Sequence, residues 1–153
     1  MILIDTHVLV WAVDDSRRLS RAAASAIRRA RHNGGMAVSV ITLWEIAALL
    51  AKGRVRAYGT LEASIQIFLE DVAVRPITPE ICALGAMFPD DYSHDPADRI
   101  IGGTARAEGL TLVTHDERIR RSPLTPGVGF AAAGDNSRGQ GRPRATQPLS
   151  AQS

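Results

Sequence analysis

Four acidic residues, Asp5, Glu45, Asp98 and Asp116, stand where an open parallel sheet would bring carboxylates together. Asp5 and Asp116 each follow a short apolar run, and α/β sheets bind ligands outside the carboxyl ends of their strands. Carboxylates that share a crevice repel each other and raise each other's pKa values unless a cation compensates them. The residue types therefore predict a hard divalent metal as the occupant and a phosphate as the substrate.

Glu45 has a second interpretation that the sequence leaves open. Thr42 is placed to cap the helix that follows the apolar residues 37–40, and Glu45 stands three residues after it. This is the spacing of a capping box, in which the acid binds the backbone at the start of its own helix. The helix that contains Asp98 has a cap of its own. Asp95 precedes Pro96 and is interpreted as the N-cap, which puts Asp98 at the third helical position.

The elements that would position these acids alternate between strand and helix signals. Strands are expected over residues 2–5, 37–40, 72–77 and 111–113. Helices are expected over residues 20–32, 42–50, 61–70, 80–87 and 96–108, with a short helix after residue 116. Strands separated by helices favour an α/β fold, a three-layer α/β/α sandwich around a central parallel sheet.

The C-terminal part of the chain differs from the rest. Residues 1–124 are predicted to form one domain, whereas residues 125–153 are rich in Pro, Gly, Ser, Gln, Ala and Arg. Such a segment buries too little surface to offset its ordering entropy, so we expect disorder from residue 132 onward. Residues 123–126 are interpreted as a loop, and a C-terminal closing strand is expected to be missing.

Composition narrows the class of protein. With 45% hydrophobic and 22% charged residues, the chain is globular in character, and it contains no apolar run of membrane-span length. No basic leader precedes Asp5, so no signal peptide is expected. The single cysteine, Cys82, excludes an internal disulfide framework and fits a reducing cytoplasm. Because it falls in an expected helix, we interpret Cys82 as a buried structural thiol.

The basic residues form no strong signal for a partner. Residues 1–124 carry equal numbers of basic and acidic side chains, and the net charge of +2 comes from the C-terminal segment. Arginines cluster within residues 17–21 and 28–31. Each cluster is either a solvated helix face or a patch that tracks phosphates, and the sequence leaves both readings open.

The four acids and the residues around them resemble the PIN-domain nucleases and, among these, the VapC-type toxins of type II toxin–antitoxin systems. Four segments carry the resemblance, each with one of the acids: residues 2–11, 38–46, 94–105 and 112–116. The resemblance implies a PIN-like α/β/α fold and a metal-dependent endoribonuclease that uses Mg²⁺ or Mn²⁺. It also implies an RNA substrate, a cognate antitoxin that blocks the active site, and a homodimer.

On this resemblance the acids have distinct roles. Asp5 and Asp98 are expected as direct metal ligands, and Glu45 and Asp116 complete the site directly or through water. Since Mg²⁺ keeps several of its waters, two direct carboxylates would suffice.

Three further residues are candidates for substrate binding. Thr6 and Thr114 are interpreted as donors to a metal-bound water or a phosphate, or alternatively as hydroxyls that cap turns. Arg99, which follows a metal-site acid, is expected to pair with an RNA phosphate or with a nearby carboxylate.

The remaining polar and aromatic candidates carry weaker expectations. His94 is interpreted as a loop residue without a role, and strand alternation predicts that His115 points away from Asp116. Trp11 and Trp44 are expected in the core, with Trp44 alternatively lining a groove for the antitoxin.

Two other classes of function compete with this prediction. The first is a PIN-like module that binds its antitoxin or RNA without cleaving, and the intact set of four acids argues against it. The second is a phosphatase or nucleotide-binding α/β protein. Residues 6–9, after the first strand, contain no glycine-rich phosphate loop and no P-loop lysine, so this class is disfavoured.

Overall fold

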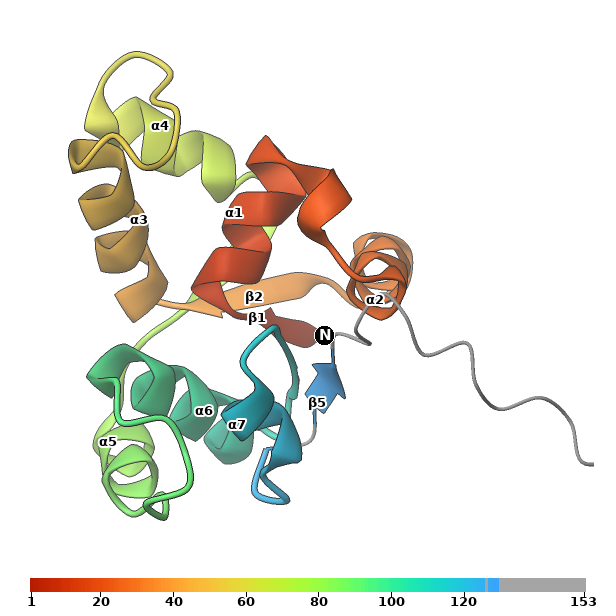
Figure 1. Ribbon diagram of the computed structural model, residues 1–153, viewed down its shortest axis with the longest axis vertical. Coiled ribbons are helices and arrows are strands. Elements are labelled where there is room, and N and C mark those ends of the chain that lie inside the picture. Colours follow the sequence, from red (N-terminus) through yellow and green to blue (C-terminus); the bar gives the residue numbers. More distant parts are fainter. Residues whose placement is uncertain (126, 130–153) are drawn as a thin grey trace, which may run out of the picture.

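The computed structural model describes residues 1–125 and 127–129, which are organised around a five-stranded sheet (Figure 1). The strands are β1 (Ile2–Ile4), β2 (Met36–Ser39), β3 (Val72–Arg75), β4 (Thr111–Thr114) and β5 (Gly127–Gly129). All neighbouring strands are parallel, in the order β3-β2-β1-β4-β5. Because β1 lies in the middle, the residue that follows it, Asp5, lies at the centre of the carboxyl edge of the sheet.

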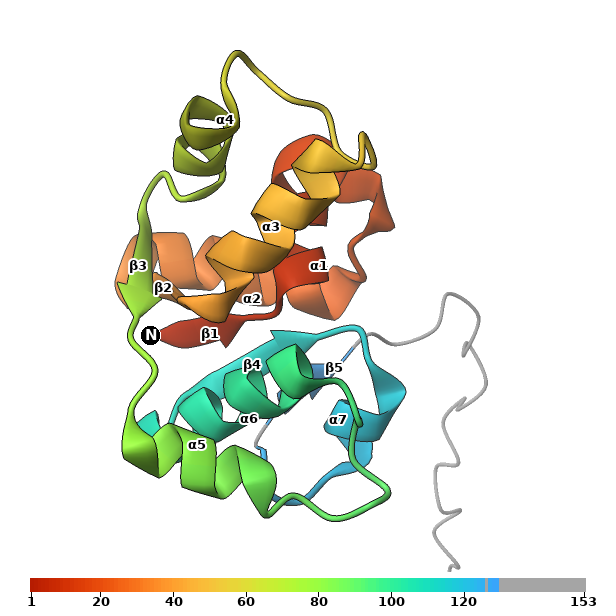
Figure 2. The same cartoon turned by 90° about the vertical axis from the view of Figure 1, so that its left-hand side faces the viewer.

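Helices cover both faces of the sheet, so the predicted three-layer α/β/α architecture is confirmed (Figures 1 and 2). One face carries α1 (Thr6–Asp14), α2 (Arg21–Asn33), α3 (Ile41–Ala51) and α4 (Leu61–Phe68), with a short 3-10 helix, η1 (Ser16–Arg18), between the first two. The other face carries α5 (Pro79–Ala86), α6 (Pro96–Glu108) and α7 (Glu117–Arg121).

The period-2 alternation of the strands divides the core into two clusters. Ile4, Val38 and Val113 point to the side of α1, α2 and α3, where they pack with apolar residues of those helices. Their sequence neighbours point to the opposite side and pack against α6 and α7: Leu3, Ala37 and Leu112. Side chains of successive strand residues face opposite sides of a sheet, so each short apolar run serves both layers.

Two glycines bring α5 and α6 unusually close together. A Cβ atom on Gly103 would lie 2.6 Å from the carbonyl oxygen of Ile81, and one on Gly85 would lie 2.7 Å from that of Arg99. Real side chains do not tolerate such distances, so the two helices pack backbone to backbone at these points. This contact fixes where α6, and with it Asp98, lies relative to the sheet.

The fifth strand corrects the expectation that a closing strand is missing. Residues 127–129 pair in parallel with β4, with Gly127 opposite Leu112 and Gly129 opposite Thr114. An edge strand is held by main-chain hydrogen bonds on one side, so a Gly-Val-Gly segment forms one without the apolar run that marks a buried strand. The strand also lies beyond the domain boundary expected at residue 124. The segment expected to be disordered from residue 132 lies outside the described residues.

Two side chains expected to be buried are exposed, so both of those predictions are wrong. Cys82 is exposed because α5 directs Ile81 and Gly85 toward α6, which leaves the cysteine on the uncovered face. Trp44 retains 71% of its surface, because α3 buries the face that contains Thr42 and Ile46.

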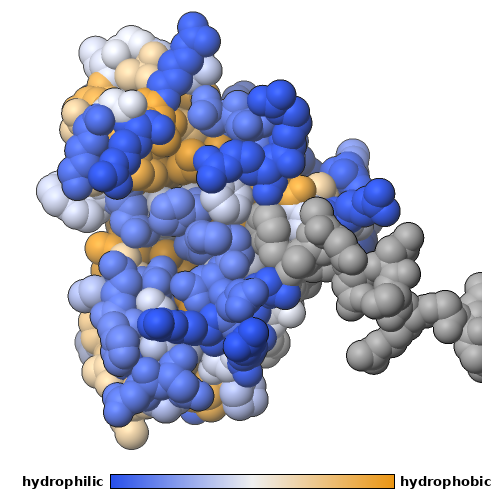
Figure 3. All heavy atoms as spheres, viewed as in Figure 1, coloured by the Kyte–Doolittle hydropathy of each residue, from blue (hydrophilic) through white to orange (hydrophobic). Residues whose placement is uncertain are grey.

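The face of the molecule seen in Figure 3 has an apolar and a polar region. Apolar residues gather between α1, α3 and α4, and a polar band crosses the middle of the face. Of the helices formed by residues 1–125, none has the length and apolar character needed to cross a membrane.

Candidate active site

Asp5 is the most deeply buried of the predicted acids. It follows β1 and occupies the N-cap position of α1, but its side chain does not cap that helix. The residue is 3% exposed, and its Oδ2 accepts a hydrogen bond from the hydroxyl of Thr114, 2.8 Å away. A buried carboxylate is costly unless its charge is compensated, and the Asp5 side chain does not cap its helix, so its oxygens can bind a cation.

Glu45 reaches the same region from α3. The Thr6 hydroxyl, at the start of α1, lies 2.5 Å from Glu45 Oε2 and 3.0 Å from the hydroxyl of Thr42. α3 begins at Ile41 with no side-chain cap, and Thr42 lies inside its first turn. The capping-box interpretation of Glu45 is therefore wrong: its carboxylate bonds to a different helix.

The environment of Glu45 disfavours its charged form. The pKa of Glu45 is raised to about 7, chiefly by burial. The hydrogen bond from Thr6 opposes this rise in pKa, and the negative charges of Asp5 and Asp98 add to it. These acids are therefore close enough to repel one another.

Asp98 approaches from the opposite layer. As predicted, Asp95 caps α6: its Oδ1 accepts from the backbone N–H groups of Ala97 and Asp98. The Asp98 side chain remains available, and its Oδ2 accepts from the hydroxyl of Ser93 at 2.5 Å. Burial, followed by repulsion from other acids that include Asp5, raises the pKa of Asp98 to about 6 against the effect of the Ser93 bond.

Asp116 lies at the edge of this group. It caps α7, with Oδ1 accepting from the N–H groups of Arg118 and Ile119 at 2.7 and 3.2 Å. Its own N–H donates to the Thr114 hydroxyl, which in turn donates to Asp5. Its negative charge contributes to the raised pKa of Asp98. Asp116 thus combines a capping role with proximity to the other acids.

The carboxylates converge from four elements on the carboxyl edge of the sheet, at the ends of β1 and β4 and on α3 and α6. Two of the carboxyl groups have pKa values near neutrality because they are buried among other negative charges. A divalent cation would relieve this repulsion, and oxygen donors of this kind suit a hard ion.

Comparison with known proteins identifies the family. The PIN domain family matches residues 2–123, which contain all four acids and most of the described structure. This chain belongs to the PIN-domain family.

Within that family, the chain is similar to ribonuclease VapC22 of Mycobacterium tuberculosis, with 36% identity over 119 residues, 78% of this chain and 89% of the relative. This level of identity assigns the PIN domain to the VapC-type ribonucleases, the toxins of toxin–antitoxin systems, as the resemblance predicted.

Solved structures share the fold at lower sequence identity. VapBC2 from Rickettsia felis, crystallised with a DNA fragment from its promoter, has a TM-score of 0.67 and 19% identity, covering 86% of this chain and all of that one. VapC20 of Mycobacterium tuberculosis, a toxin that cleaves the sarcin–ricin loop, has a TM-score of 0.57 and 15% identity, covering 82% and 98% of the two chains.

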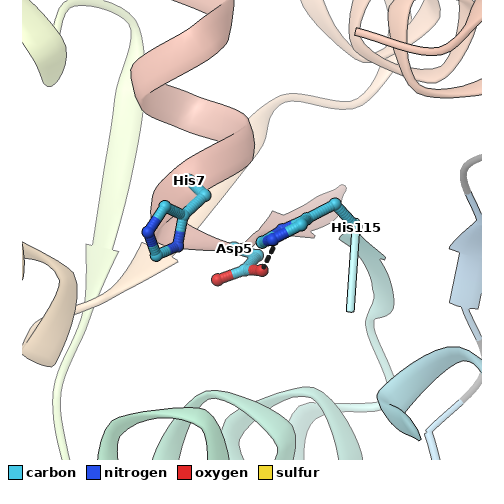
Figure 4. Close-up of side chains that lie close together, drawn as sticks. All are labelled: Asp5, His7 and His115. Carbon is cyan, nitrogen blue, oxygen red and sulfur yellow. Dashed lines mark ion pairs between the residues drawn. The ribbon is translucent and has the colours of Figure 1, made fainter. Parts of the chain in front are cut away.

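Two histidines of this PIN domain were missed by sequence reasoning. His115 Nδ1 lies 3.6 Å from Asp5 Oδ2, and the His7 ring lies beside it with 5.2 Å between ring centroids (Figure 4). β4 ends at Thr114, and the side chains of Thr114 and His115 both face Asp5, so strand alternation does not continue to His115. That His115 points away from Asp116 stays a prediction. His7 follows Asp5 by two residues, and this short spacing was the only feature of the sequence that could have indicated its proximity to Asp5.

The three predicted substrate-binding residues divide into two kinds. Thr6 and Thr114 lie in the site, where their hydroxyls hold Glu45 and Asp5. Arg99 instead donates to four backbone carbonyls, that of Gly85 in α5 and those of Phe88, Pro89 and Ser93 in the loop between α5 and α6. Arg99 forms no ion pair with a carboxylate of residues 1–125, so the expected pairing with a nearby carboxylate is wrong, whereas pairing with an RNA phosphate stays a prediction. Its guanidinium holds the loop.

The remaining candidates lie as follows. His94 is exposed, in line with a loop residue. Trp11 is partly buried against the core that contains α1 and contacts the His115 ring at 4.8 Å between centroids. The guanidinium of Arg18 stacks over the Trp11 ring, with its Cζ atom 4.4 Å from the ring centroid. Arg18, Trp11 and His115 therefore form a contiguous group that ends at Asp5.

Proposed function

We propose that this VapC-type PIN domain is a metal-dependent endoribonuclease and the toxin of a type II toxin–antitoxin module, and that Asp5, Glu45, Asp98 and Asp116 form its active site. The observation that carries the proposal is the gathering of acids from β1, α3 and α6 at the carboxyl edge of the sheet, close enough that the charges of Asp5 and Asp98 add to the effect of burial in raising the pKa of Glu45. Such a site favours a bound cation, and a bound cation is what phosphodiester hydrolysis requires.

The roles of the acids follow from their surroundings. Asp5 and Asp98 would bind Mg²⁺ or Mn²⁺ directly, each held in place by one hydroxyl, Thr114 for Asp5 and Ser93 for Asp98. Asp116 would act directly or through water, since Oδ1 is used to cap α7. When bound, the ion neutralises the phosphate charge and lowers the pKa of a coordinated water.

Glu45 is suited to handling the attacking water. Thr6 holds Oε2, and a pKa of about 7 lets the carboxyl accept or release a proton near neutral pH. We therefore assign Glu45 the role of orienting the nucleophile, and Thr6 that of positioning Glu45.

The proposed partners are an RNA substrate, a cognate antitoxin and a second copy of the chain. VapBC2 from Rickettsia felis was crystallised bound to a DNA fragment from its promoter. As a VapC-type toxin, this chain is proposed to pair with an antitoxin that covers its site. Trp44, exposed on the same helix as Glu45, is a suitable contact for it. An RNA substrate implies action in the cytoplasm.

The test compares purified wild type with Asp98→Asn, which keeps the size of the side chain and removes its charge. We expect Mg²⁺- or Mn²⁺-dependent RNA cleavage to fall at least about 100-fold, equivalent to about 2.7 kcal/mol in the activation barrier. Glu62→Gln, on the exposed surface of α4, is the matched control and should cleave as wild type does.

Equal cleavage by wild type and Asp98→Asn would overturn the proposal. If neither protein cleaves while both bind the antitoxin, the chain is instead a binding module that has lost catalysis. Sequencing of new RNA 5′ ends after induced expression of both forms would identify the RNA that is cut.

A further inference from the structure

Two imidazoles and a carboxylate oxygen face one another beside the proposed magnesium site. One ligand atom from each of Asp5, His7 and His115 lies within 4.8 Å of the other two, and both rings lie close over the Asp5 carboxylate in Figure 4. His7 belongs to the first turn of α1 and His115 follows β4. Because β1 and β4 are neighbours in the sheet, the topology itself brings these segments together.

We propose that Asp5, His7 and His115 form a second cation site, one that takes a transition-metal ion of the Zn²⁺, Co²⁺ or Ni²⁺ class. Imidazole nitrogens suit these ions, whereas Mg²⁺ prefers a shell of oxygen ligands and water. The site goes beyond the proposed ribonuclease function, which the four acids account for without the histidines. It shares only Asp5 with that function.

The distances fit such an ion. Zn²⁺ binds nitrogen and oxygen at about 2.0–2.2 Å, so tetrahedral coordination places neighbouring ligand atoms roughly 3.3–3.6 Å apart. Nδ1 of His115 and Oδ2 of Asp5 are already separated by 3.6 Å. His7 is exposed, so its side chain has room for the small rotation that would close the remaining distances.

Neighbouring side chains hold two of the three ligands. The Thr114 hydroxyl donates to Asp5 Oδ2 at 2.8 Å, which fixes the carboxylate and leaves Oδ1 for the ion of the magnesium site. The Trp11 ring packs edgewise on His115, with 4.8 Å between centroids. Contacts of this kind, which orient the ligands of a metal, raise its affinity.

The charges around the rings also favour a cation. His115 lies in the field of three carboxylates, and His7 in the field of two. At His7 these charges are opposed by His115, when it is protonated, and by Arg18, which stacks on Trp11. Since a histidine binds a metal through its neutral ring, Arg18 is the one positive charge named here that remains against these carboxylates once the ion is bound.

The test is a titration of the full-length chain, without a polyhistidine tag, with Co²⁺ followed by its visible absorption and with Zn²⁺ in competition with a colorimetric chelator. Wild type should bind one Co²⁺ ion with the visible bands of nitrogen coordination, in addition to any Co²⁺ held by the oxygen ligands of the magnesium site. His7→Ala and His115→Ala should each weaken binding at least about tenfold. The other two histidines of the chain supply the matched controls, and His32→Ala and His94→Ala should bind as wild type does.

Asp98→Asn separates this proposal from the ribonuclease function, because it disables the magnesium site and should leave Co²⁺ binding in place. Far-ultraviolet circular dichroism checks that each variant is folded. Co²⁺ binding by His7→Ala as tight as that of wild type would overturn the second site, whether or not RNA is cleaved. Conversely, histidine-dependent Co²⁺ binding without any RNA cleavage would refute the proposed function and leave this site intact.

Discussion

Replacing Glu45 by glutamine should stabilise the metal-free protein at neutral pH, although it removes a residue of the proposed active site. Burial raises the pKa of Glu45 from 4.5 to about 7. Between these values the folded state binds more protons than the unfolded state, so the free energy of unfolding falls as the pH rises through this range. Glutamine has no charge to bury and can keep the hydrogen bond from Thr6.

The size of the effect follows from the difference in pKa. A rise of about 2.5 corresponds to a ceiling of about 3.4 kcal/mol. Glu45 is only half-buried, and solvent screening reduces this to about 1–2 kcal/mol. For a chain of this length, the melting temperature should rise by about 2–8 °C.

The measurement is chemical denaturation in the presence of EDTA at pH 5 and pH 8, for wild type, Glu45→Gln and the exposed control Glu62→Gln. At pH 5 the wild type and Glu45→Gln should have similar free energies of unfolding. At pH 8 Glu45→Gln should be the more stable by about 1–2 kcal/mol. Excess Mg²⁺ should then stabilise wild type more than the variant, because the ion compensates a charge that the variant lacks.

A stability difference between wild type and Glu45→Gln that is the same at both pH values would refute this reasoning. It would mean that Glu45 ionises in the folded protein as easily as in the unfolded chain. If Glu45→Gln is less stable than wild type at pH 8, the burial of the Glu45 charge does not destabilise the folded protein, and the prediction is also refuted.

Three further outcomes are expected. Mg²⁺-dependent cleavage should rise from pH 6 to pH 8, measured on one RNA at constant ionic strength. Asp98, with a pKa of about 6, must lose its proton to hold the cation, and Glu45, with a pKa of about 7, must lose its proton to orient the attacking water as a base. Gly103→Ala should lower the free energy of unfolding by about 1–3 kcal/mol in denaturant titrations, since its methyl group would meet the Ile81 carbonyl at 2.6 Å. Deletion of residues 132–153 should leave the cleavage rate unchanged, and a large loss would show that this segment contributes to activity.

Much of the fold could be predicted because its signals are local. Short apolar runs indicated the first four strands, and Asp95 before a proline marked the start of α6. β5 gave no such signal, because a glycine-rich edge strand depends on main-chain pairing with β4 rather than on its own side chains. The exposure of Cys82 likewise depended on which face of α5 meets α6, and no single helix encodes that.

For the site, the sequence by itself determined the acids and their order, and the family to which they belong. Only the tertiary structure decided what each side chain contacts: it joined Glu45 to Thr6, turned Arg99 to the backbone of a loop, and brought His7 and His115 over Asp5. These pairs are distant in the sequence or lie just past a strand end, where alternation no longer applies. The order of β2, β1 and β4 in the sheet sets their proximity, and residue spacing along the chain does not record it.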